Sequence, residues 1–240
     1  MSNRNALNLE TNLLLTAPVV QIFTSSGTYT PNSKLALAVV EIVGGGGSGG
    51  GVPVTSGQTA AASGGGGAGY CKSYFTPTQI GASAAVTIGA GGAASGAGNN
   101  PGNVGGQSIF NPAGTGLTLT AAAGGAGNSM AATTTPDQLF GGAGGSGVNG
   151  DINIQGQNAG FSYTNGPDTG VVVGGKGGDS QFGHGAPANG CAGLSSASFG
   201  DAPTGYGAGS CGAYGCNSAS AVSSLAGTDG ICIITEFLYG

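Results

Sequence analysis

The residues able to do chemistry are few: one histidine, five cysteines and some scattered carboxylates. His184 stands in Phe-Gly-His-Gly-Ala-Pro, and it would act as a general base only if a nucleophile and an orienting acid met it in the folded chain. A loop or surface histidine is the simpler interpretation. The acids most isolated among glycines, where we expect them to cap turns, are Asp137, Asp151, Asp168, Asp179 and Asp201. We therefore expect no catalytic residue, and the chain is predicted not to be an enzyme.

Zinc-ligand types gather toward the C-terminal third, where Cys191, Cys211 and Cys216 follow His184. The four residues between Cys211 and Cys216 are at the long limit of the spacing in zinc sites. The same two thiols could bridge the short loop or remain free, and the sequence leaves all three states open. The odd number of cysteines favours free thiols and assembly in a reducing cytoplasm. No metal and no cofactor is expected.

Residues 170–177, Gly-Val-Val-Val-Gly-Gly-Lys-Gly, resemble a phosphate-binding loop. The Ser or Thr that would hold Mg²⁺ is replaced by Gly177, and no helical pattern follows. Nucleotide binding is therefore not predicted.

The composition excludes an ordinary globular enzyme, because 55 of 240 residues are glycine and only 5% are charged. Four basic residues against nine acidic ones leave no basic patch, so nucleic acid and anionic membranes are poor partners. Residues 1–12 lack the pattern of a secretion signal, and no apolar stretch approaches the roughly 18 residues of a membrane span. We expect neither secretion through a signal peptide nor membrane insertion.

The glycines fall in runs, at 44–51, 64–69, 89–98, 124–127, 141–150, 174–178 and 205–209. A threefold polyglycine II helix has no internal hydrogen bonds, so a buried one needs partners on neighbouring helices, which approach closely only where side chains are absent. At least six packed helices are predicted. Conventional strands are expected at 19–23, 35–43 and 230–238, which should pair with one another. The predicted fold is thus a polyglycine II helix sandwich with little regular secondary structure, a few short β-strands from the two chain ends and essentially no α-helix.

The scarce aromatic residues are candidates for recognition, because stiff rings among Ser, Gly and Asn resemble the composition of binding loops. The alternative is that single rings only pack against the ends of the scaffold. The candidate receptor-binding residues are Tyr70, Tyr74, Phe75, Phe161, Tyr163, Tyr206 and Tyr214.

Six ordered stretches resemble the glycine-rich domain of bacteriophage tail-fibre proteins. They are 21–31 (Gln-Ile-Phe-Thr-Ser-Ser-Gly-Thr-Tyr-Thr-Pro), 38–47 (Ala-Val-Val-Glu-Ile-Val-Gly-Gly-Gly-Gly), 86–92, 150–157, 177–183 and 229–236. The chain is similar to the tip adhesins of T-even-like long tail fibres, whose polyglycine II sandwich carries loops that bind bacterial outer-membrane proteins. By this resemblance the recognition segments would be 52–84, 93–104, 128–140, 157–170 and 184–204.

The resemblance implies a virion protein of the tail fibre or tail tip, assembled in the host cytoplasm. Residues 1–20 would attach to other tail or fibre proteins, although this region is shorter than in those adhesins, and residues 21–240 would form the glycine-rich receptor-binding domain. The expected partner is a bacterial outer-membrane protein or a surface glycan. A homo-oligomer, a purely structural fibre component and an antifreeze-like polyglycine protein stay open as alternatives. The last of these fits least, since the glycines do not recur strictly every third residue.

Overall fold

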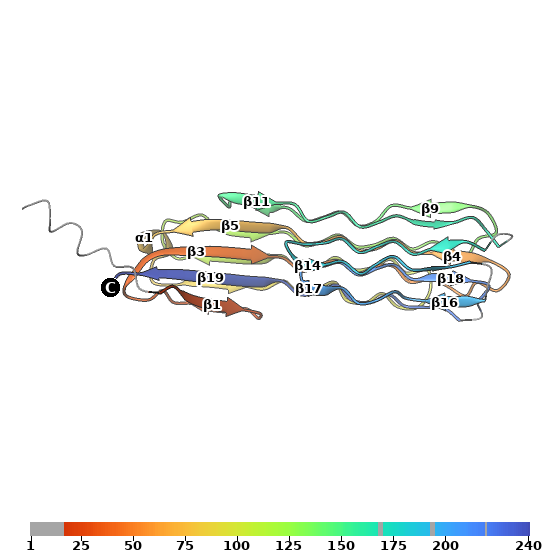
Figure 1. Cartoon of the computed structure of the whole chain (residues 1–240), viewed down its shortest axis with the longest axis horizontal. Helices are drawn as coiled ribbons and strands as arrows, with labels where there is room; N and C mark the ends of the chain where they lie inside the picture. The colour runs from red at the N-terminus through yellow and green to blue at the C-terminus, as the bar shows by residue number, and fades with distance from the viewer. Residues whose placement is uncertain (1–16, 168–169, 193–194, 219) are drawn as a thin grey trace, which may run out of the picture.

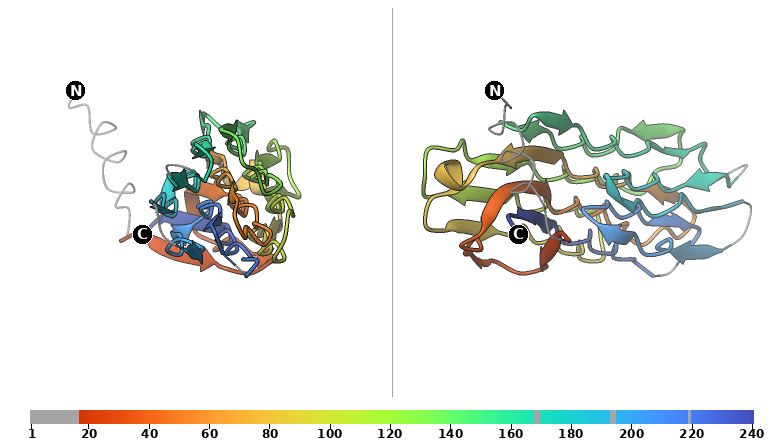
Figure 2. Two further views of the ribbon diagram at one scale, coloured as in Figure 1. Left: turned by 90° about the vertical axis from the view of Figure 1, so that its right-hand side faces the viewer. Right: turned by 60° about the vertical axis from the view of Figure 1, so that its left-hand side comes forward.

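The computed structural model describes residues 17–167, 170–192, 195–218 and 220–240. These residues form an elongated molecule with β-sheets at both ends and glycine-rich extended segments between them (Figure 1). The end on the left of Figure 1, which holds the C-terminus and the first described residues, is named the proximal end, and the opposite end is named the distal end. The end-on view in Figure 2 shows the extended segments packed side by side.

Two five-stranded antiparallel sheets pack face to face at the proximal end. The first has the order β1 (Val19–Phe23), β19 (Ile231–Leu238), β3 (Leu35–Val43), β5 (Tyr70–Phe75) and β11 (Ile152–Ile154). The second has the order β10 (Gly147–Val148), β8 (Leu119–Ala121), β7 (Ser108–Pro112), β6 (Ala84–Thr87) and β2 (Gly27–Tyr29). The predicted pairing of the two chain ends is confirmed, since β19 lies between β1 and β3. The predicted attachment segment, residues 1–20, overlaps β1 at Val19 and Val20, and its residues 1–16 lie outside the described ranges.

The proximal core follows from the alternation of apolar residues along these strands. Phe75 and Phe110, from opposite sheets, pack with their ring centroids 5.3 Å apart, and Tyr29 lies 6.1 Å from Phe110. One acid, Glu236, is also buried, and it accepts hydrogen bonds from the Tyr29 hydroxyl at 2.6 Å and from the Asn32 N–H at 2.9 Å. This core therefore contains large side chains and a satisfied polar pair.

The central segments are threefold helices, as their hydrogen bonds show. Every third N–H of residues 44–52 points to the same neighbour: those of Gly45, Ser48 and Gly51 donate to the carbonyl oxygens of residues 106, 103 and 100. The falling partner numbers mean that the two segments are antiparallel. A repeat of three residues with all bonds to other segments is the pattern of a polyglycine II helix.

Two of these helices, 44–52 and 62–69, lie at the centre of the bundle, and each bonds to six neighbouring segments. The neighbours of 44–52 are 62–69, 89–92, 100–106, 122–128, 207–213 and 222–228. The neighbours of 62–69 are 44–52, 122–128, 142–145, 157, 175–178 and 207–213. The predicted bundle of at least six packed helices is confirmed.

Close approach explains the glycines in this bundle. A Cβ added to Gly47 would overlap the carbonyl oxygen of Gly125, and one added to Gly66 would overlap that of Ala143. Where a serine interrupts a central run, its hydroxyl joins the network: Ser48 Oγ accepts the Asn103 N–H at 2.7 Å. The backbone can therefore satisfy itself only when most positions lack a side chain.

Smaller sheets close the distal end. One has the order β15 (Gly190–Cys191), β13 (Val172–Val173), β12 (Ser162–Thr164) and β9 (Asp137–Leu139), and another has the order β16 (Ser196–Ser198), β18 (Tyr214–Cys216) and β4 (Thr59–Ala61). A two-stranded antiparallel sheet of β14 (Phe182–His184) and β17 (Thr204–Tyr206), named the β14–β17 pair, lies between the two ends. The strands are thus more widespread than the sequence predicted. The near absence of α-helix is confirmed, because α1 (Pro77–Ile80) is the only α-helix within the described residues.

Candidate functional site

The potentially reactive side chains do not assemble into a catalytic group. His184 is exposed on β14, and the nearby Asp179 carboxylate is engaged by Lys176 Nζ at 2.8 Å and by the Gly185 N–H at 2.7 Å. Among the described residues, no three His, Cys, Asp or Glu side chains are grouped as metal ligands. Lys176 lies in a threefold helix rather than at the start of an α-helix, so residues 170–177 do not have the geometry of a phosphate-binding loop.

The two cysteine side chains that interact in the structure are not the two that are close in the sequence, and all five thiols are free. Cys216, on β18, is the thiol nearest Cys191, whereas Cys211 is buried and bonds weakly to the Asp201 carbonyl oxygen at 3.7 Å. Burial, followed by the hydrogen bond and charge of Cys216, raises the pKa of Cys191 to about 12. A thiol with so high a pKa stays protonated at neutral pH and is a poor nucleophile.

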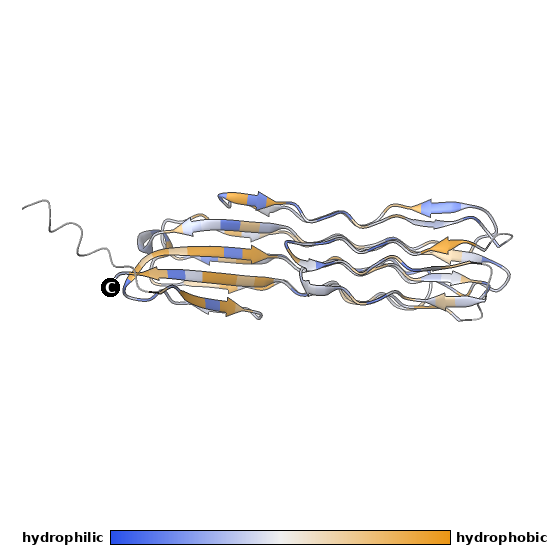
Figure 3. Cartoon of the chain, in the orientation of Figure 1, coloured by the Kyte–Doolittle hydropathy of each residue, from blue (hydrophilic) through white to orange (hydrophobic). Residues whose placement is uncertain are grey.

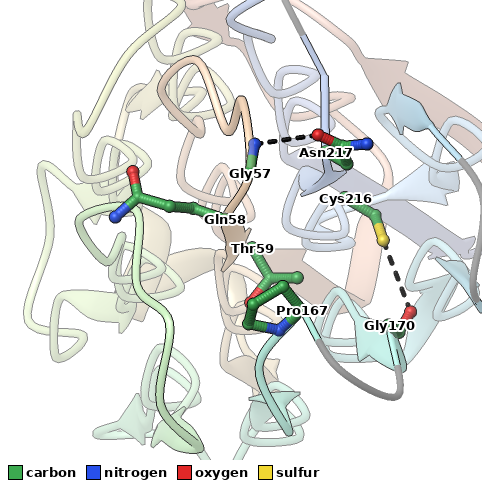
Figure 4. A pocket seen from close by; sticks show the side chains of 7 residues that line it. All are labelled: Gly57, Gln58, Thr59, Pro167, Gly170, Cys216 and Asn217. Carbon is green, nitrogen blue, oxygen red and sulfur yellow. Dashed lines mark hydrogen bonds between the residues drawn. The ribbon is translucent and has the colours of Figure 1, made fainter.

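A cavity of about 190 Å³ opens among the distal turns (Figure 4). It is lined by Gly57, Gln58, Thr59, Pro167, Gly170, Cys216 and Asn217. Its polar groups already bond to one another, since the Gly57 N–H donates to Asn217 Oδ1 at 2.8 Å and Cys216 Sγ donates to the Gly170 carbonyl at 3.4 Å. None of the described lining residues has a charged side chain.

Three of the predicted recognition residues lie on β5 at the proximal end, and two of them are buried. Phe75 is part of the proximal core, and Tyr70 is covered by the β14–β17 pair, with its ring 5.6 Å from that of Phe182. The Tyr70 hydroxyl donates to Glu41. Tyr74 alone is well exposed, and Lys72 Nζ lies 5.9 Å from its ring centroid. Tyr70 and Phe75 therefore pack inside the molecule, because alternate β5 residues face a core and the outer face is locally covered.

The other four predicted residues are also divided. Tyr206 is half-buried against the Tyr70 cluster, and Tyr214 is buried in the distal core. Phe161 and Tyr163 lie at the distal end, where Phe161 is 62% exposed and Tyr163 is partly exposed. The seven residues do not form one surface, and this pair is the part that remains accessible at the distal end.

Phe161 has an aromatic neighbour that the sequence did not single out. In the β9–β12 ladder Leu139 pairs with Ser162, and the Ala159 N–H donates to the Gly142 carbonyl oxygen at 2.9 Å, which continues the same register. Phe140 is therefore opposite Phe161. Ser162 faces inward and is fully buried, so the two phenylalanines point outward, and Phe140 is 79% exposed.

The same outward face continues across the neighbouring strand. Tyr163 pairs with Val173, while the alternate residue Val172 is buried. Val171 and Val173 are both exposed. These neighbours complete what we name the distal patch: Phe140, Phe161, Tyr163, Val171 and Val173. In the sequence, the only signal for the valines of the patch is the short apolar run Val171-Val172-Val173, which is typical of an extended segment.

Within the described ranges, the surroundings of the distal patch carry little charge. The lysines of the described ranges are Lys34, Lys72 and Lys176, which belong to the proximal end and to the bundle. Asp137 and Gln138 precede Phe140 on β9. The patch is therefore suited to apolar contact and neutral hydrogen bonding, and not to attraction of an anionic partner.

The recognition segments implied by the resemblance reach the distal end only in part. Residues 52–84 include the distal turn around Gly57, the central helix 62–69 and proximal β5, so they form no single loop. Residues 128–140 and 157–170 contain the aromatic members of the distal patch. Residues 168–169, and residues 193–194 of the segment 184–204, lie outside the described ranges. No helix in the described part of the chain has the length and apolar character needed to cross a membrane.

A family model described as a glycine-rich domain matches residues 23–236. A comparison with curated proteins finds no match. The family match covers both proximal sheets, the bundle and the distal sheets, so it spans nearly all of the described structure.

Proposed function

The chain belongs to the glycine-rich domain family, and from this premise we propose that it is a receptor-binding protein of a bacteriophage tail fibre. The observation that supports this proposal is the distal patch, an exposed apolar surface at the end of the molecule opposite β1 and the C-terminus. Large aromatic residues exposed on a rigid support are the residues that concentrate binding energy at interfaces.

The hydrogen-bonded bundle holds the distal patch in a fixed position. Residues 44–51 span roughly 25 Å at about 3.1 Å per residue, and their N–H groups bond to neighbouring segments almost throughout. A patch held on such a bundle loses little conformational freedom when it binds, which favours affinity.

The partner that fits the patch is a bacterial outer-membrane protein or a surface glycan. Aromatic rings pack against either an apolar protein surface or the flat face of a sugar ring, and neither contact requires charge. In this proposal other tail or fibre proteins bind through residues 1–20, and the protein is part of the virion after assembly in the host cytoplasm.

Binding to whole cells tests the proposal. Fluorescently labelled chain is expected to bind saturably to the bacterium on which a phage carrying it grows, and to reduce adsorption of that phage. Protease treatment of the cells should abolish binding to a protein receptor, whereas periodate should abolish binding to a glycan. Absence of saturable binding to every host of such a phage would contradict the proposal and favour a structural fibre component.

A further inference from the structure

A second apolar surface lies at the proximal end, on the outer side of the sheet β1-β19-β3-β5-β11. Residues that alternate with the core residues point away from the second sheet. They include six apolar side chains that we name the proximal face: Val20, Ile22, Leu37, Val39, Ile152 and Phe237. Ile22 is 61% exposed and Val20 is 53% exposed. In Figure 3 the strands β1, β19 and β3 of this sheet are coloured mostly as apolar, with residues of both faces included.

Part of the same outer surface is already covered by the chain itself. Toward the bundle, the β14–β17 pair packs Phe182 and Tyr206 against Tyr70, Val43 and Ile231. The six residues of the proximal face lie beyond this pair of strands or beside it, and each is at least partly exposed. Near the bundle, the outer side of this sheet therefore already packs against apolar side chains of the same chain.

The charges on the proximal face are balanced. Glu41 and Lys72 lie on neighbouring strands with 3.9 Å between Lys72 Nζ and Glu41 Oε1. Because the two charges oppose each other, two copies of this face would meet without a net repulsion between like charges. This neutrality makes the face compatible with its own copy.

We propose that two copies of the chain pack through the proximal face, sheet against sheet, around a twofold axis. The five strands have 5, 8, 9, 6 and 3 residues, so at about 3.3 Å per residue and about 4.8 Å between strands the face measures roughly 500 Å². Pairing two such faces buries about 1,000 Å² in total, which is the least expected of a specific interface. The other side of this sheet already packs against β10-β8-β7-β6-β2 in this manner within one chain.

The dimer leaves both distal patches accessible, because the proximal face lies at the other end of the molecule. It does not depend on the receptor function, since it follows from the proximal sheet alone. Its failure would leave the distal patch and the proposed binding to cells unaffected.

Sedimentation of the full chain tests the proposal at roughly 50 µM, well above a micromolar dissociation constant. The expected mass is twice the 22.4 kDa of one chain. The double variant Ile22→Lys with Val39→Lys should be monomeric, with dissociation at least about a hundredfold more favourable, because paired lysines would be desolvated against apolar residues. Leu117→Lys is the matched control, since Leu117 is 67% exposed and lies in the β7–β8 connection of the other proximal sheet.

Equal melting temperatures of the variants show that only association has changed. If the double variant does not fold, Ile22→Ser provides the same comparison at a position that is already exposed. A monomeric full chain overturns the proposal. So does a dimer that persists in the folded face variant, or dimerisation only after removal of residues 1–16, which would make that segment the occupant of the face.

Discussion

The two ends of the molecule are both antiparallel β-structure, but their cores are built from side chains of different size. The proximal core holds Tyr29, Phe75 and Phe110, with aromatic rings in contact across the two sheets. The distal core holds four alanines, three of them at residues 60–62, together with Val52, Met130, Val172, Cys216 and a single buried tyrosine. Burial of large apolar side chains provides most of the stability of a sheet packing, so the proximal end should be the more stable.

Because of this difference, the proximal end supplies most of the buried aromatic residues that stabilise the fold, and the distal end exposes the aromatic residues available for binding. At the proximal end Phe75 and Phe110 lie inside, between the paired sheets, whereas at the distal end Phe140 and Phe161 lie outside. The bundle between the ends is held by backbone hydrogen bonds and does not rely on either core. Substitutions on the distal patch should therefore leave the fold intact, which is the property that a variable recognition surface needs.

The largest expected effect is a failure to fold when a side chain enters the bundle that joins the two ends. In Gly47→Ala the new methyl group would overlap the carbonyl oxygen of Gly125 and force the helix 44–52 away from its neighbour 122–128. We expect no soluble, protease-resistant protein from this variant. Gly96→Ala is the control, because the nearest atom to its Cβ is Asn100 Nδ2 at 3.6 Å, and it should be recovered at the yield of the parent chain.

Truncation of a proximal core ring should have the next largest effect. Phe110 is fully buried between Tyr29 and Phe75, and Phe110→Ala should lower the free energy of unfolding by about 3–5 kcal/mol. Denaturant titration followed by circular dichroism measures this change. A loss below 1 kcal/mol would mean that the bundle, and not the proximal core, determines stability.

The matching truncation in the distal core should cost less. Val172 is fully buried but loses only two methyl groups in Val172→Ala, so the expected decrease in the free energy of unfolding is about 2 kcal/mol. The same denaturant titration applies. Equal losses for Val172→Ala and Phe110→Ala would remove the proposed difference between the two ends.

Alkaline pH should destabilise the proximal end through its buried thiol. Burial raises the pKa of Cys232 to about 12, above the value near 8.5 of an unfolded cysteine. The neutral thiol is favoured in the folded state, so its contribution is complete below pH 8.5 and is lost as the pH rises toward 12. At one unit above 8.5 the loss is about 1.4 kcal/mol.

Melting temperatures recorded between pH 7 and pH 11 in high salt test this expectation, because salt screens general charge repulsion. A melting temperature that stays constant up to pH 11 would contradict it.

Local patterns were sufficient to predict the scaffold. The strands 19–23 and 35–43 have the same bounds in the sequence prediction and in the structure, because segments in which four of five and eight of nine residues are apolar are a strong local signal. The glycine runs predicted the bundle, since only absent side chains permit such close approach. The distal strands were largely missed. β15 has two residues and β16 has three, and it is their neighbours that determine their pairing.

The candidate site was harder to predict, because exposure depends on distant segments. Tyr70 is buried by the β14–β17 pair, which lies more than a hundred residues away in the chain, and no pattern around Tyr70 indicates this. Phe75 was grouped with Tyr74 although adjacent strand residues face opposite sides. Phe140 went unnoticed as a single residue, because its significance comes from the register that places it opposite Phe161.

The most direct test of the proposed function compares the two ends in one binding measurement. The distal double variant Phe140→Ser with Phe161→Ser should keep its melting temperature, since both rings are exposed, and should lose at least about tenfold in affinity for host cells. The proximal variant Leu117→Ser, at a position 67% exposed and outside the proximal face, should bind like the parent chain. Unchanged binding by the distal variant, or loss of binding by the proximal one alone, would contradict recognition through the distal patch.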